Sequence, residues 1–169
     1  MIIPEHILRD IVKQIPAVVI NSKITQKPQF GWGDKLELNR YLEKKKNDSY
    51  PLIWLLPSVE HHSEDGDRCK KRLEIIIATL EEDENLFNPQ RYNQSFEIVL
   101  NPVTEQVIKG LTDSGVTKII GAKWDVFKHP NYSDDDGKSN GTIALWDALK
   151  ITFNEVEFNN NCLNTNIWQ

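Results

Sequence analysis

The chain has 169 residues, of which 39% are hydrophobic and 27% are charged, and its formal net charge is −5. A chain of this length suits one domain, which can bury roughly 70% of its unfolded surface without metals or disulfides. No apolar run approaches the roughly 20 residues of a membrane helix. The acidic balance argues against a protein that binds nucleic acid by neutralising phosphates.

The start of the chain and its cysteines indicate a cytoplasmic site of synthesis and folding. The first residues include acids and lack a small-residue cleavage site after an apolar core, so they do not predict a secretory signal. Cys69 and Cys162 are too few for a disulfide framework and form no C-x-x-C pair, which predicts two free thiols. The chain is therefore expected to remain in the cytoplasm that makes it.

The first expected element is an amphipathic helix over residues 4–15, where apolar residues recur at helical spacing between Pro4 and Pro16. Residues 21–35, rich in glycine and proline around a tryptophan, predict an irregular loop or an open hairpin. One or two helical turns are expected over residues 36–46.

The stretch "SYPLIWLLPS" places five consecutive apolar residues, Leu52 to Leu56, between two prolines. It is too short for a buried helix, so it predicts a central strand that is covered on both faces. One face would meet the helices and the other a neighbouring subunit; alternatively, the two helices and the loop around Trp32 cover both faces. A long loop over residues 60–72 and a strand over residues 70–83 are expected to follow.

The second half of the chain predicts a helix and two strands. Apolar spacing indicates a helix within residues 86–115, broken or kinked at Pro102 and stopped at Gly115. Residues 116–132 predict a strand, and 133–141 a turn rich in Asp, Asn and Gly. In the closing strand, residues 142–158, the apolar phase changes, which predicts a bulge near Asn154 and Glu155.

One cluster has metal-ligand chemistry: His61, His62, Glu64, Asp65, Asp67 and Cys69. Adjacent histidines point in different directions on an extended chain, and no distant ligand pair is evident. We interpret the segment as a solvated loop and expect no bound metal or cofactor. Likewise, "SDDDGKSNG" lacks calcium-loop spacing, and the common nucleotide-binding and nucleophile motifs are absent.

Tryptophans and basic residues suggest contact surfaces. Trp54, Trp124 and Trp146 are expected in the core, whereas Trp32 and Trp168, in a loop and a tail, are candidate interface anchors. The basic runs "EKKKND" and "RCKKR" are flanked by acids, which is typical of solvated edges or of the rim of a contact with an acidic partner.

The expected elements run helix, strand, strand, helix, strand, strand. This order predicts an α+β domain with a single antiparallel sheet of about four strands, two helices packed on one face, and long loops. Residues 1–158 would form the domain and residues 159–169 a C-terminal tail.

That order, with "YPLIWL", "RYNQSFEIVL" and "DALKITFNEVEFNNNC", resembles small neck proteins of tailed bacteriophages over roughly residues 1–162. The similarity is to tail-terminator or tail-completion proteins, and to ring proteins of the crAss-like phages. It implies a virion structural protein, not an enzyme. Copies would form a closed ring of about six or twelve subunits by a repeated head-to-tail contact. The ring would join the portal or its adaptor to the tail, with genomic DNA passing through an acidic lumen without specific binding.

Under this interpretation three regions are candidate interfaces: residues 29–35, 60–72 and 159–169. The candidate contact residues are Trp32, His61, His62, Asp65, Asp67, Arg68, Lys70, Leu163, Ile167 and Trp168. The alternative is a metal-dependent enzyme or small-ligand-binding protein that uses the His61–Cys69 loop, for example a nuclease with Glu64, Asp65 and Asp67. A DNA-binding regulator is disfavoured, because no helix-turn-helix with a basic recognition helix is evident.

Overall fold

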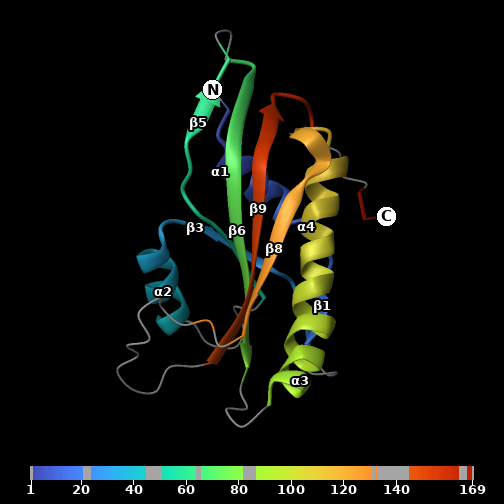
Figure 1. The fold of residues 1–169 in the computed structure, drawn as a ribbon. Coiled ribbons are helices and arrows are strands. Elements are labelled where there is room, and N and C mark those ends of the chain that lie inside the picture. The colour runs from blue at the N-terminus through green and yellow to red at the C-terminus, as the bar shows by residue number, and fades with distance from the viewer. Residues whose placement is uncertain are drawn as a thin grey trace.

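The fold is an α+β arrangement built on one long mixed sheet (Figure 1). The structure, a computed structural model, describes residues 2–20, 24–44, 51–63, 66–81, 87–130, 132, 145–163 and 167–168. None of the helices within these ranges has the length and apolar character needed to cross a bilayer.

Two long antiparallel strands, β6 (Arg68–Glu81) and β9 (Leu145–Asn159), form the centre of the sheet. On one side of β6 lie β5 (Glu60–His62), near its start, and β4 (Leu52–Leu55), nearer its end. Beyond β4, β3 (Gln29–Trp32) pairs with it in parallel. On the other side of β9 lie β7 (Thr117–Ile119) and β8 (Trp124–His129). A separate hairpin joins β1 (Val18–Ile20) to β2 (Ile24–Gln26).

Helices cover both faces of the sheet. One face packs against α1 (Pro4–Val12) and a continuous helical run of α3 (Asn88–Arg91), the π-helix η2 (Tyr92–Leu100) and α4 (Asn101–Asp113). The other face packs against α2 (Lys35–Lys44). Figure 1 shows α1 behind the sheet and α2 on the opposite side of the molecule from α4.

The predicted sheet is wrong in three respects, although the α+β class holds. The described sheet has seven strands, it includes the parallel pair β3–β4, and helices pack on two faces and not one. The short strands β3 and β5 escaped prediction, because three or four residues are too few to display a two-residue period. Residues 60–62 and 68–72, expected in a long loop, instead belong to the β5–β6 hairpin.

The apolar stretch at Leu52–Leu56 is covered on both faces within the chain. Ile53 and Leu55 belong to the core beneath α1 and α4, whereas Leu52, Trp54 and Leu56 belong to the core beneath α2. The expectation that a neighbouring subunit covers one of its faces is therefore wrong. The cover comes from α2 (Lys35–Lys44), which lies in the region where the sequence predicts one or two helical turns.

The start of α2 has a clear local cause. The Asp34 carboxylate accepts a hydrogen bond from the Glu37 backbone N–H at 2.8 Å, and the Glu37 carboxylate accepts one from the Asp34 N–H at 2.9 Å. This reciprocal capping satisfies two N–H groups at the helix start. It brings α2 against the sheet, where Trp54 donates its indole N–H to the Gly33 carbonyl at 2.9 Å.

Several other predictions are confirmed or refined. Helix α1, the strand at Leu52–Leu55, and β6 and β9 lie where expected. The helical run is not interrupted at Pro102; the geometry instead changes from π-helical to α-helical at Asn101. Gly115 follows the helix end with φ +74°, the left-handed conformation typical of a stop signal.

The predicted bulge in the last strand is confirmed. Phe153 pairs with Leu73 and Val156 pairs with Lys71, so Asn154 and Glu155 together lie opposite one residue of β6. The two-for-one count keeps Phe153 and Val156 on the same buried face. The predicted turn at residues 133–141 lies outside the described residues.

Candidate functional site

Strand β8 is the most exposed strand of the sheet. All six of its residues, Trp124–His129, are exposed. Its inner edge pairs with β9 along its full length, and no strand in the described part of the chain pairs with its outer edge. An open strand edge presents backbone N–H and C=O groups that another strand can pair with.

The apolar side chains of β8 lie on both faces of the strand. Residues that pair across antiparallel strands share a face. Trp124 and Val126 pair with Phe153 and Ile151 and therefore lie on the face that packs against α1 and α4. Phe127, which is 53% exposed, lies on the opposite face. An edge strand that carries large apolar groups on both faces is suited to addition of a strand from another chain.

A short irregular turn separates β8 from β7, although both strands run in the same direction along β9. Between them, a short 3-10 turn η3 (Ile120–Ala122) has Gly121 and Ala122 at φ +74° and +49°. Residues 116–132, predicted as one strand, are therefore two strands that share the edge of β9. On β8 the Lys128 ammonium lies 4.0 Å from the centre of the Tyr92 ring, which ties this strand to η2.

At the far end of the sheet, β3 carries the predicted interface residue Trp32. Its side chain is 50% exposed and its ring packs on Phe30 at 5.9 Å between centroids. Within the described ranges, the only strand that pairs with β3 is β4, so β3 is the outer strand at this end of the sheet. The sheet thus ends in two different edges, each with an exposed tryptophan, Trp32 or Trp124.

The predicted contact residues of the 60–72 segment lie at one end of the sheet, at the top of Figure 1. His61 and His62 lie on β5, whereas Arg68 and Lys70 lie on β6. The Asp67 carboxylate accepts a hydrogen bond from the Asn160 side-chain amide at 3.3 Å. Asp65 and Glu64 lie outside the described residues.

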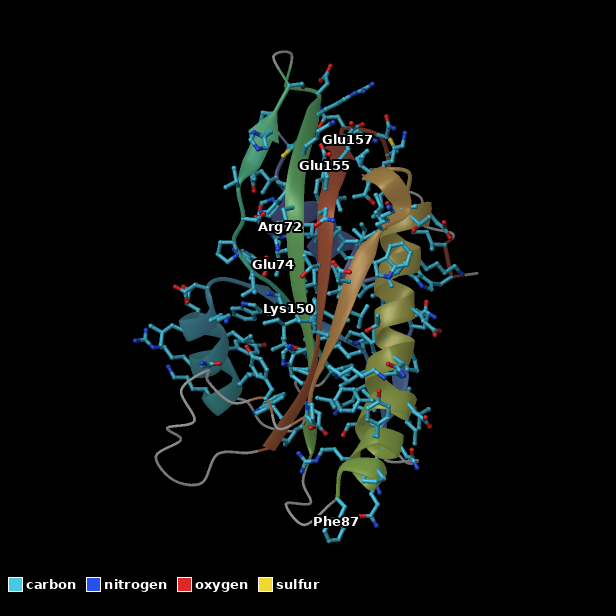
Figure 2. All side chains as sticks on the ribbon, viewed as in Figure 1. Arg72, Glu74, Phe87, Lys150, Glu155 and Glu157 are labelled. Atoms are coloured by element: carbon cyan, nitrogen blue, oxygen red, sulfur yellow. The ribbon has the colours of Figure 1, made fainter. Side chains whose placement is uncertain are left out.

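The face of the sheet above α2 carries charged side chains that neutralise one another. Lys70 pairs with Glu155 at 3.1 Å, and Arg68 approaches Glu157 at 3.8 Å. Figure 2 shows Glu155 and Glu157 on the part of the sheet that is turned toward the viewer. Because acids and bases alternate there, this face does not attract DNA phosphates as a basic patch would.

The same charged face continues toward α2 through Glu74. Its carboxylate binds Lys150 at 2.5 Å and Arg72 at 3.0 Å, and these three side chains lie together in Figure 2. The hydrogen bond from Lys150 holds the pKa of Glu74 below its usual value. Glu74 is therefore ionised throughout the neutral range.

The C-terminal tail packs against its own chain. Ile167 is buried, and Leu163 and Trp168 are partly buried against the main core. The Trp168 ring lies over Gly110 of α4, where an added Cβ would come within 3.3 Å of the ring. These three candidate contact residues thus contribute to the fold of a single copy.

A buried cluster around Lys71 was not predicted from the sequence. The Lys71 ammonium donates hydrogen bonds to Glu5 of α1 and Glu60 of β5, both at 2.7 Å. Burial acts to lower the pKa of Lys71, but these two hydrogen bonds outweigh it and raise that pKa. The available signal was the two-residue period of β6, because Lys71 shares the inward phase of Leu73 and Ile75.

The exposure of β8 was not predicted either, although a strand was expected there. Trp124 was expected in the core, and that prediction is wrong, since its side chain is exposed. Within the described ranges no helix or strand covers the outer edge of β8, and its residues do not by themselves encode this. The comparison with protein-family models finds no family that matches the chain, and the comparison with curated proteins finds no relative.

Proposed function

We propose that this chain is a structural, non-enzymatic subunit of the neck or tail of a tailed phage. Its copies form a closed ring between the portal or its adaptor and the tail. The observation that carries the proposal is the edge strand β8, whose six residues are all exposed and whose apolar side chains lie on both faces. A surface of this kind is suited to a protein partner. The resemblance of the sequence to phage neck proteins is the reason for proposing the neck or tail as the assembly.

A head-to-tail ring needs two different patches that fit each other. The two outer strands of the described sheet, β8 and β3, supply such a pair. In the proposed contact, the outer edge of β8 on one copy pairs with the outer edge of β3 on the next, and the sheet continues across the subunit boundary. Trp124 and Phe127 would then pack near Trp32 of the next copy.

The charge of the subunit suits the passage of DNA. The formal net charge is −5, and the charged face of the sheet is paired internally. A lumen lined by such subunits repels phosphate or leaves it unbound, so DNA can move through it.

The test measures assembly of the full chain. Multi-angle light scattering and negative-stain imaging over a range of concentrations should show rings larger than dimers. Phe127→Lys and Val126→Lys should reduce assembly, because edge lysines oppose strand pairing. Trp32→Lys should reduce it from the opposite side of the contact. The matched control is Ile98→Lys on η2, since Ile98 has similar exposure, 47% against 42% for Val126.

Each outcome decides the proposal. Loss of rings in the β8 and β3 variants, with rings retained by Ile98→Lys, supports it. Dimers that depend on β8 but not on Trp32 would replace the ring by a two-fold pair of β8 strands. Monomers at every concentration, or assembly unchanged by the β8 variants, would contradict it.

A further inference from the structure

Three potential metal ligands converge between β5 and β6. A carboxylate oxygen of Glu60, an imidazole nitrogen of His62 and the thiol sulfur of Cys69 all lie within 4.8 Å of one another. The Glu60 Oε2 atom and the His62 Nε2 atom are 3.5 Å apart. In a tetrahedral zinc site, the usual bond lengths put neighbouring ligand atoms about 3.4–3.6 Å apart. One edge of such a tetrahedron is therefore already formed.

The strand register brings these residues together. His62 pairs with Cys69 and Glu60 pairs with Lys71, so Glu60, His62 and Cys69 share one face of the hairpin. The intervening His61 pairs with Lys70 and lies on the opposite face. Of the two adjacent histidines, the register therefore selects His62 for the cluster.

We propose that Glu60, His62 and Cys69 form a zinc site, with water as the fourth ligand. Thiolate, imidazole and carboxylate are the three side-chain ligand types that zinc uses in proteins. Cys69 is fully buried and His62 is exposed, so the site has one anchored ligand and an open side through which the ion enters.

The neighbouring groups orient Glu60 and favour a cation. Lys71 holds the Oε1 atom of Glu60 at 2.7 Å, which leaves Oε2 turned toward His62. The carboxylates of Glu5 and Glu60 share the single ammonium of Lys71, so this group carries one excess negative charge before any metal binds. With the Cys69 thiolate added, the local charge balances a divalent ion.

Metal binding must displace a proton from the thiol. Burial raises the pKa of Cys69, and the Glu60 charge raises it further, so the thiol is protonated at neutral pH before the metal arrives. Binding forms the zinc–sulfur bond, breaks the S–H bond and releases one proton to solvent. The bound ion then ties the three-residue strand β5 to the long strand β6.

The experiment uses the full chain with Cys162→Ser, because Cys162 is the other free thiol. The probe is Co²⁺, followed by competition with Zn²⁺. Cobalt bound to thiolate gives a near-ultraviolet charge-transfer band, which aqueous cobalt lacks. This band should appear when cobalt is titrated in and disappear when zinc is added. His62→Ala should lower the affinity for cobalt by at least about tenfold.

The matched control is His61→Ala, one residue away on the opposite face, which should leave the affinity unchanged. A second measurement is the zinc-dependent rise in melting temperature, expected in the parent and in His61→Ala but not in His62→Ala. The absence of a thiolate–cobalt band in the parent overturns the site. So does an affinity that His62→Ala leaves unchanged or that His61→Ala lowers equally. Because ring assembly plays no part in these measurements, the result is independent of the proposed function.

Discussion

Arg91, at the end of α3, and Asp147, near the start of β9, form an ion pair in the interior, with 3.3 Å between the guanidinium nitrogen and the carboxylate oxygen. Their side chains are 2% and 0% exposed. The pair joins the helical run to the central strand at the end of the sheet opposite the β5–β6 hairpin. A buried charge costs free energy when it loses its partner, so this contact specifies how the helix is placed.

Asp147→Ala should lower the free energy of unfolding by about 3–5 kcal/mol, because the buried guanidinium loses its counter-charge. Urea denaturation measures the change. The control is Glu155→Ala, which breaks the exposed pair with Lys70 and should cost at most about 1 kcal/mol. Equal small losses in both variants would show that Arg91 finds water or another partner.

Gly110→Ala should destabilise the protein although it places alanine in a helix. Helix propensity alone favours alanine by about 1 kcal/mol, but the added Cβ would lie 2.6 Å from the Ile11 Cγ2 atom. Overpacking of this kind costs about 1–3 kcal/mol, because α1 must shift. Thermal melts should show a lower midpoint for Gly110→Ala, whereas Lys109→Ala, at an exposed position, should not. A raised midpoint for Gly110→Ala would mean that α1 moves freely.

The Glu5–Lys71 contact should make stability depend on pH in acid. Burial acts to raise the pKa of Glu5, but the hydrogen bond from Lys71 outweighs it, and the pKa is lowered below 4.5. The contribution is therefore present above pH 4.5 and is lost as the pH falls through the lowered pKa. Two other titratable groups lie at this contact: Glu60, which binds Lys71, and His6, which lies near Glu5.

Glu5→Gln tests that dependence. At pH 7 the free energy of unfolding of the variant should be lower than that of the parent by roughly 1.5–3 kcal/mol, because the variant loses a hydrogen bond between charged groups. The difference should shrink as the pH falls through the lowered pKa of Glu5, since Glu5 then becomes protonated in both states. Urea titrations at pH 7 and at a series of lower pH values provide the comparison. A constant difference would assign the loss to packing and not to charge.

Deletion of Asn154 should be far more damaging than its substitution. The bulge places two residues opposite one, and removing one of them would turn either the segment before it or Val156 and Phe158 to the wrong face. We expect loss of the cooperative unfolding transition in the deletion variant, measured by circular dichroism. Asn154→Ala, at an exposed position, should stay within about 0.5 kcal/mol of the parent. A deletion variant that unfolds cooperatively at the parental midpoint would show that the register adjusts.

The hydrophobic pattern alone predicted the long elements and the bulge. Apolar spacing places α1 and the main helical run, and the shift of phase between Phe153 and Val156 locates the bulge. These features are local, because the backbone period fixes which side chains share a face. For the same reason the inward phase of β6 already contained Lys71, although a lysine at an apolar position was not interpreted as a buried ion pair.

Pairings between distant segments decided the rest. The short strands β3 and β5 exist because β4 and β6 pair with them, and α2 covers the second face although its sequence is mostly polar. The candidate zinc ligands meet only because β5 folds back on β6, and β8 is exposed only because no described element covers it. Periodicity reports which side of an element is apolar, whereas coverage and register depend on the packing of segments far apart in the chain.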